Sequence, residues 1–80
     1  MFTKKVLLKQ KLKFNSNETC YLYECSNVFD GLFYMFEIVK DNNTVINIKS
    51  SDDKAKMEKI FFNTVSLDNK KYLFNNGYIK

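Results

Sequence analysis

Histidine, arginine, proline and tryptophan are all missing from this chain of 80 residues. Without histidine, the usual general base near neutral pH is absent, and neither a Ser-His nor a Cys-His pair can form within one chain. Without arginine, the bidentate clamp on phosphate or carboxylate groups is absent too. The start of a helix already explains Asp52 and Asp53, and Glu37 has no obvious acidic neighbour. We therefore expect no enzymatic activity, no catalytic residues and no small-molecule substrate.

Residues that hold metals or cofactors are also scarce. Cys20 and Cys25 are the only cysteines, and two thiols without histidine cannot complete a four-ligand zinc site in a monomer. The glycines, Gly31 and Gly77, stand too far apart to form a phosphate-binding loop. Along one strand the two cysteines would lie roughly 16 Å apart, which is too far for a disulfide. We expect no metal, no cofactor and two reduced, partly buried thiols, and the sequence leaves the reactivity of either thiol open.

Long apolar runs are absent as well. The longest, residues 32–36, cannot cross a bilayer, and the run at residues 6–8 is too short for the core of a signal peptide. Eighty residues leave room for one domain, residues 1–80, and eight Phe and five Tyr can supply its core. We expect a cytoplasmic protein without membrane contact, located in the host cytoplasm if a phage encodes it.

Alternation of apolar and polar residues predicts four strands, at residues 2–14, 19–25, 32–40 and 44–50. In the first, one face has Val6, Leu8, Leu12 and Phe14, and the other has Leu7, Lys9, Lys11 and Lys13. In the last, Thr44, Ile46 and Ile48 point inward. Residues 32–40 are apolar on both faces except at Glu37, so they form a central strand. Short turns, including the tight turn 41–43, predict an antiparallel meander.

After residue 50 the period changes to that of a helix. Met57, Ile60, Phe61 and Thr64 follow the i, i+3, i+4, i+7 spacing of one helical face. Ser50 or Ser51 can cap this helix, and Asp52 and Asp53 place negative charge at its positive end. A second, short helix is expected near residues 69–76, ended by Gly77. The predicted fold class is α+β: an antiparallel four-stranded meander with one main helix packed on one face and a short C-terminal helix.

The apolar residues outnumber the positions that one covered sheet face can hide. We expect Tyr21, Tyr23, Phe33 and Met35 to bind a partner protein or a second copy of the chain as a homodimer, with Lys9, Lys11 and Lys13 as a charged rim. The alternative is that the C-terminal helix covers the second face and completes a monomeric core. Val28 and Phe29 either extend the hairpin or fold under the domain as a plug.

Nucleic acid is the competing partner. Lysines in a row on one strand, with tyrosines on the next, could bind a single strand weakly through phosphates and stacked bases. A net charge of +4 is small for this role, and the arginines that read bases are missing. We therefore expect a protein-binding module first, and a weak single-stranded nucleic-acid-binding protein as the alternative.

Two resemblances bear on this expectation. Four strands followed by a helix with a Ser-Asp-Asp start and a Val65-Ser66-Leu67 exit resemble a family of short uncharacterised proteins of clostridial type, whose function is unknown. In size and lack of motifs the chain is also similar to the anti-CRISPR proteins, which are phage-encoded inhibitors of bacterial defence systems. This second resemblance implies a binder that blocks a host defence protein by occupying its surface. Because this chain is basic, unlike the acidic DNA mimics of that class, it implies an acidic or mixed target surface.

Overall fold

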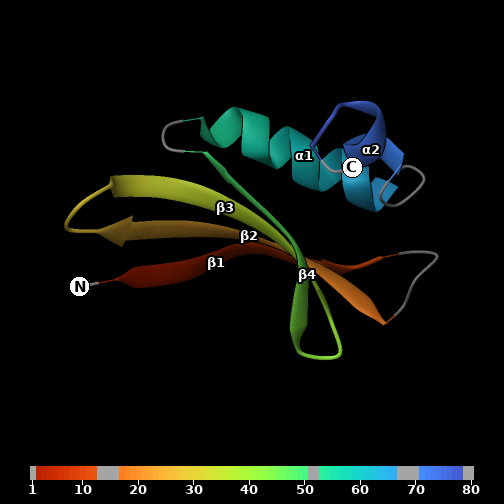
Figure 1. The fold of residues 1–80 in the computed structure, drawn as a ribbon, viewed down its shortest axis with the longest axis horizontal. Helices are drawn as coiled ribbons and strands as arrows, with labels where there is room; N and C mark the ends of the chain where they lie inside the picture. The colour runs from red at the N-terminus through yellow and green to blue at the C-terminus, as the bar shows by residue number, and fades with distance from the viewer. Residues whose placement is uncertain (1, 13–16, 51–52, 67–70, 79–80) are drawn as a thin grey trace.

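The computed structural model describes residues 2–12, 17–50, 53–66 and 71–78. Its elements are β1 (Thr3–Lys11), β2 (Glu18–Asn27), β3 (Gly31–Lys40), β4 (Asn43–Ser50), α1 (Lys54–Ser66) and α2 (Lys71–Asn75). The strands form one antiparallel sheet in the order β1-β2-β3-β4 (Figure 1). The predicted α+β meander with a main helix and a short second helix is therefore confirmed.

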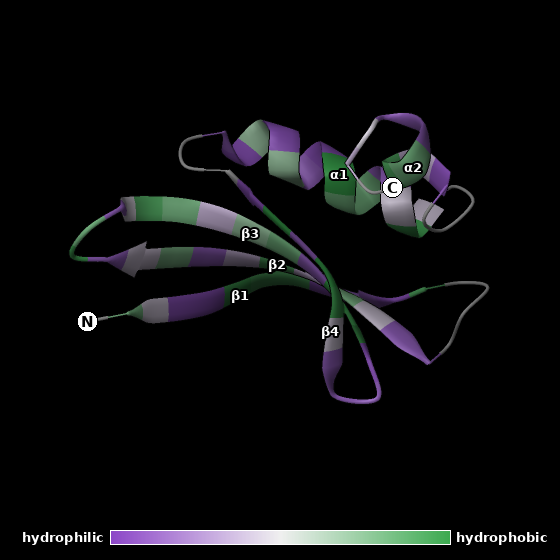
Figure 2. Cartoon of the chain, in the orientation of Figure 1, coloured by the Kyte–Doolittle hydropathy of each residue, from purple (hydrophilic) through white to green (hydrophobic). Residues whose placement is uncertain are grey.

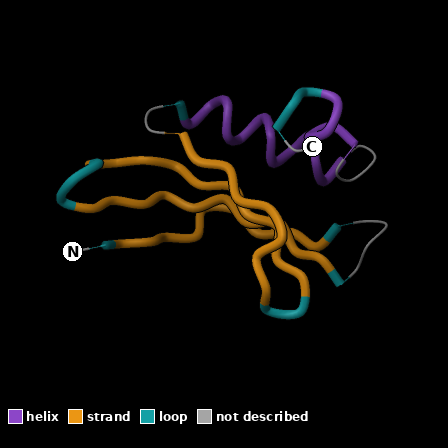
Figure 3. Tube along the Cα trace, in the orientation of Figure 1, coloured by secondary structure: helices purple, strands orange, loops and turns teal. Residues whose placement is uncertain are grey.

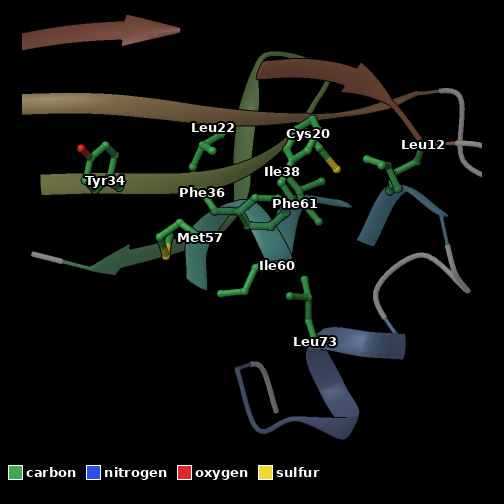
Figure 4. Packing of buried hydrophobic residues seen from close by; sticks show 11 residues of the cluster. Leu12, Cys20, Leu22, Tyr34, Phe36, Ile38, Met57, Ile60, Phe61 and Leu73 are labelled. Atoms are coloured by element: carbon green, nitrogen blue, oxygen red, sulfur yellow. The ribbon is translucent and has the colours of Figure 1, made fainter. Parts of the chain in front are cut away.

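Both helices lie on the same side of the sheet (Figure 3). α1 contacts β2 and β3, and α2 packs against α1. In the core between the layers, Phe36 of β3 meets Phe61 of α1 edge to face, with ring centroids 6.3 Å apart (Figure 4). Leu73 of α2 is fully buried in this same cluster. Because α2 belongs to the helical layer, the alternative in which the C-terminal helix covers the second sheet face is wrong.

The tight turn between β3 and β4 follows from its sequence. Lys40 pairs with Asn43, so the turn consists of Asp41 and Asn42, whose φ angles are 51° and 66°. Asp and Asn tolerate this left-handed conformation better than other residues with a side chain, and it matches the twist of a hairpin. The predicted tight turn is confirmed, and Asn43, which was predicted to lie in it, is the first residue of β4.

Each edge strand contains a one-residue shift in register. In β1 the shift lies between Val6 and Leu8, so Val6 pairs with Tyr23 and its side chain is half exposed. Val6 therefore lies on the face opposite the helices, together with Lys9, and its predicted place beside Leu8 on the buried face is wrong. In β4 a similar shift pairs Thr44 with Val39, which places Thr44 on that face too, contrary to the prediction. Bulges of this kind also make an edge strand a poorer template for pairing with another chain.

Helix α1 begins at a different cap from the one predicted. The Asp53 carboxylate oxygen Oδ1 accepts a hydrogen bond from the Lys56 N–H at 2.9 Å, and the Asp53 carbonyl accepts one from the Met57 N–H at 3.2 Å. Asp53 is therefore the N-cap and also supplies the negative charge expected there. Ser50 is the last residue of β4, and Ser51 and Asp52 lie outside the described residues.

Candidate functional site

The four predicted partner-binding residues lie together on the sheet face that neither helix covers, which we name the open face. Tyr21 and Tyr23 are neighbours on one side of β2, and their rings stack with centroids 5.5 Å apart. Tyr23 pairs with Met35 across the strands, and Phe33 pairs with Cys25. These four side chains and Cys25 form one apolar cluster. The four predicted residues therefore share one face of the sheet.

Three of these four side chains are nevertheless buried. Tyr23 is 7% exposed, Phe33 9% and Met35 6%, while Tyr21 is half-buried. The cover comes from the N-terminal residues of the chain: the Phe2 ring stacks on Phe33 at 6.2 Å, and the Lys4 ammonium lies 4.1 Å from the centroid of the Tyr23 ring. Of the four, Tyr21 is the one that a partner can reach directly.

A buried carboxylate lies beside this cluster. Glu37 is 7% exposed, and its oxygens accept hydrogen bonds from the Lys4 ammonium at 3.4 Å, the Thr44 hydroxyl at 3.1 Å and the Asn47 amide at 3.1 Å. The Tyr23 hydroxyl also hydrogen-bonds to it. The network joins all four strands, and the two bulges make it possible because they turn Lys4 and Thr44 toward Glu37. A buried carboxylate needs such donors, and those of Glu37 all come from within the fold.

Two titratable groups of the open-face cluster, Tyr23 and Cys25, have raised pKa values. Burial raises the pKa of Tyr23 to about 12, and the neighbouring Glu37 charge adds to this effect. Burial also raises the pKa of the Cys25 thiol. At neutral pH neither group is a base or a nucleophile. In the described residues no three side chains of His, Cys, Asp or Glu come close enough to hold a metal ion, and neither α1 nor α2 is long and apolar enough to cross a bilayer.

Lysines surround the aromatic part of the open face. Strand register places Lys4, Lys9, Lys11 and Lys49 on this face, opposite Cys25, Tyr21, Thr19 and Met35 respectively. The Lys9 ammonium lies 5.7 Å from the centroid of the Tyr21 ring. The other strand carboxylates, Glu18 and Glu24, pair with Lys40 and Tyr34 on the opposite face. The predicted rim of Lys9 and Lys11 is thus on the open face, and Lys13 lies outside the described residues.

The most exposed apolar side chains lie at one end of the sheet, where the sequence did not predict a site. Val28 is 74% exposed and Phe29 93%, both in the turn between β2 and β3, and Phe2 and Leu32 beside them are each about half exposed. We name these four residues the apolar tip. Figure 2 shows hydrophobic colouring on this turn and on the first residues of β3. The two turn residues neither extend the hairpin nor plug the domain, so both alternatives for them are wrong.

The turn that carries Phe29 is fixed by a single side chain. Asn27 Oδ1 accepts hydrogen bonds from the Phe29 N–H at 2.9 Å and the Asp30 N–H at 2.6 Å. Asn27 Nδ2 donates to the Asp30 carboxylate at 3.0 Å, and Gly31 closes the turn with φ of 67°. These polar residues on both sides of Val28 and Phe29 are the turn signal that could have located the tip from the sequence.

Comparison of the chain with models of protein families, with curated proteins and with solved structures finds no match. The two resemblances drawn from the sequence therefore stay predictions, and a function for this chain has to be argued from its own geometry.

Proposed function

We propose that this chain is a non-catalytic protein-binding module that uses the apolar tip as its anchor. The observation that carries the proposal is the Phe29 ring, 93% exposed on a turn whose backbone is fixed by Asn27. An exposed ring on a preordered turn gains apolar burial when it enters a partner pocket and loses little conformational entropy. Aromatic residues displayed in this way are frequent anchors of protein interfaces.

The rest of the sheet supports this anchor. The buried cluster of Tyr23, Phe33 and Met35 holds β2 and β3 together behind the turn, and the lysines of the open face steer an acidic partner into contact. The mechanism is steric occupation of the partner surface. The resemblance to anti-CRISPR proteins makes a bacterial defence protein the partner class that we propose, and a host protein blocked in this way would lose access to its own ligand.

Single-stranded nucleic acid is the second candidate, and one observation favours it: the Lys9 ammonium lies over the half-buried Tyr21 ring. This is the combination of cation and aromatic ring on which a phosphate and a base can rest. The candidate ranks second because the neighbouring Tyr23 and Phe33 rings are at most 9% exposed and cannot stack with bases. The half-exposed Phe2 ring lies at the opposite end of β1 from Lys9 and Lys11.

Affinity capture from a nuclease-treated bacterial lysate tests the proposal. The immobilised baits are the wild-type chain, F29A, and F74A as a matched control, because Phe74 on α2 is also a largely exposed ring, 62% exposed. We expect one protein to be enriched equally by the wild type and F74A and to be lost with F29A. Equal capture by all three baits, or capture that disappears with nuclease treatment, would contradict the proposal. Sedimentation of the purified chain identifies the case in which the partner is a second copy.

A further inference from the structure

We infer that the open face binds an acidic, extended protein segment, held by Lys9, Lys11 and Lys49 beside the Tyr21 ring. This inference rests on the proposed function. It gives the chemistry of the partner's surface beside the partner pocket in which we propose that the apolar tip binds. The two surfaces are continuous: Phe2 belongs to the tip, and its ring stacks on Phe33 of the open face at 6.2 Å.

The positive charge of this face is not compensated within the described residues. Lys4 pairs with Glu37 at 3.4 Å, and that carboxylate is further occupied by Thr44 and Asn47. Lys9, Lys11 and Lys49 make no ion pair with a described carboxylate. Three ammonium groups on one sheet face without internal partners are complementary to carboxylates from outside.

The spacing of the lysines suits an extended chain. Lys9 and Lys11 are two positions apart on β1, so their backbones are separated by roughly 7 Å on one face. An extended peptide repeats its side chains with the same period, and carboxylates at alternate positions can therefore face both lysines. Lys49 lies on β4, the opposite edge of the sheet, which places positive charge on both sides of Tyr21.

The burial of the rings favours a protein segment over nucleic acid. Proteins that bind single strands combine a positively charged groove with several aromatic side chains on which successive bases stack. The Tyr23 ring is 7% exposed and lies under Lys4, and the Phe33 ring lies under Phe2. Beside Lys9 and Lys11 the one reachable ring is Tyr21, because the half-exposed Phe2 ring lies at the other end of β1. This part of the face therefore lacks the row of rings on which successive bases stack, whereas carboxylates need the ammonium groups alone.

Two probes of equal charge test this inference in solution. One is a labelled peptide of alternating glutamate and serine, and the other is a thymidine oligonucleotide with the same number of negative charges, each titrated by fluorescence anisotropy. The binding variant is K9Q/K11Q/K49Q, and the matched control is K40Q/K54Q/K59Q, which removes the same charge at exposed positions off the open face. We expect the peptide affinity to fall about tenfold in the binding variant, since each exposed pair contributes about twofold, and less than twofold in the control.

Each other outcome overturns the inference. Tighter binding of the oligonucleotide than of the peptide, with the same dependence on the three lysines, would assign the face to nucleic acid. Equal losses in both variants would show attraction to net charge without a site. No binding of the peptide would show that the open face does not hold an acidic segment. F29A should leave the peptide affinity within twofold of wild type, so failure of the tip anchor and failure of this site are distinguishable.

Discussion

Two phenylalanines on one hairpin should respond in opposite ways to removal of their rings. Phe29 is 93% exposed at the turn, whereas Phe33, four residues later on β3, is 9% exposed beneath Phe2. We predict that F29A weakens partner binding without affecting folding, and that F33A destabilises the fold. The pair separates a residue that binds from one that supports the binding surface, although the sequence presents both as aromatic residues of one segment.

The expected magnitudes follow from these exposures. Loss of an exposed side chain changes the free energy of unfolding by no more than about 0.5 kcal/mol. Loss of the Phe33 ring removes buried area and leaves a cavity, at a cost of about 3 kcal/mol. In the complex, burial of the Phe29 ring contributes about 2 kcal/mol to the free energy of binding, and its removal therefore raises the dissociation constant about thirtyfold.

Urea denaturation followed by circular dichroism measures the first two values, and titration of the captured partner measures the third. A fall of about 1 kcal/mol or more in the free energy of unfolding of F29A would contradict this prediction, because the Phe29 ring would then be buried in solution. Unchanged stability of F33A would refute the burial of the cluster on the open face.

Three further predictions concern the sheet and its helix. The folded state raises the pKa of Tyr23 to about 12. The stability that the protonated Tyr23 hydroxyl provides is therefore fully present below pH 10 and is lost as the pH rises toward 12. By about pH 11 the free energy of unfolding, measured with urea, should fall by about 1.4 kcal/mol more in wild type than in Y23F, and an equal fall in both would contradict the raised pKa. Cys20 and Cys25 are at most 1% exposed, so a thiol reagent should label them only at the rate of unfolding; rapid labelling of the native chain would disprove their burial. D53A should cost about 1 kcal/mol of stability, and D53N, which retains a capping oxygen, much less; equal costs would exclude the cap.

The strands and the main helix could be predicted because apolar residues repeat regularly along each of these segments. Residues 31–40 are apolar on both faces, which requires a central strand, and Met57, Ile60 and Phe61 can share a face only in a helix. Antiparallel pairing then places Tyr21, Tyr23, Phe33 and Met35 on a single face. Alternation groups Tyr21 with Tyr23 and Phe33 with Met35, and the register that pairs Tyr23 with Met35 brings the two groups to the same face.

The bulges could not be predicted, because the sequence satisfies either register. Val6, Leu7 and Leu8 are all apolar, so a shift by one residue still leaves an apolar side chain toward the helices. The shift nevertheless decides which lysine reaches Glu37. The cover over Phe33 and Tyr23 was missed for a related reason: it comes from the Phe2 ring and the Lys4 side chain, whose directions depend on that register.

Hydroxyl-radical footprinting of the chain, alone and in complex with its captured partner, tests the central claim most directly. In the free chain Phe29, Phe62 and Phe74 should all be oxidised, because each ring is at least half exposed. On complex formation we predict strong protection of Phe29 and Phe2, with Phe62 and Phe74 on the helical layer still oxidised. Protection of Phe62 and Phe74 while Phe29 stays reactive would place the partner on the helices and contradict the assignment.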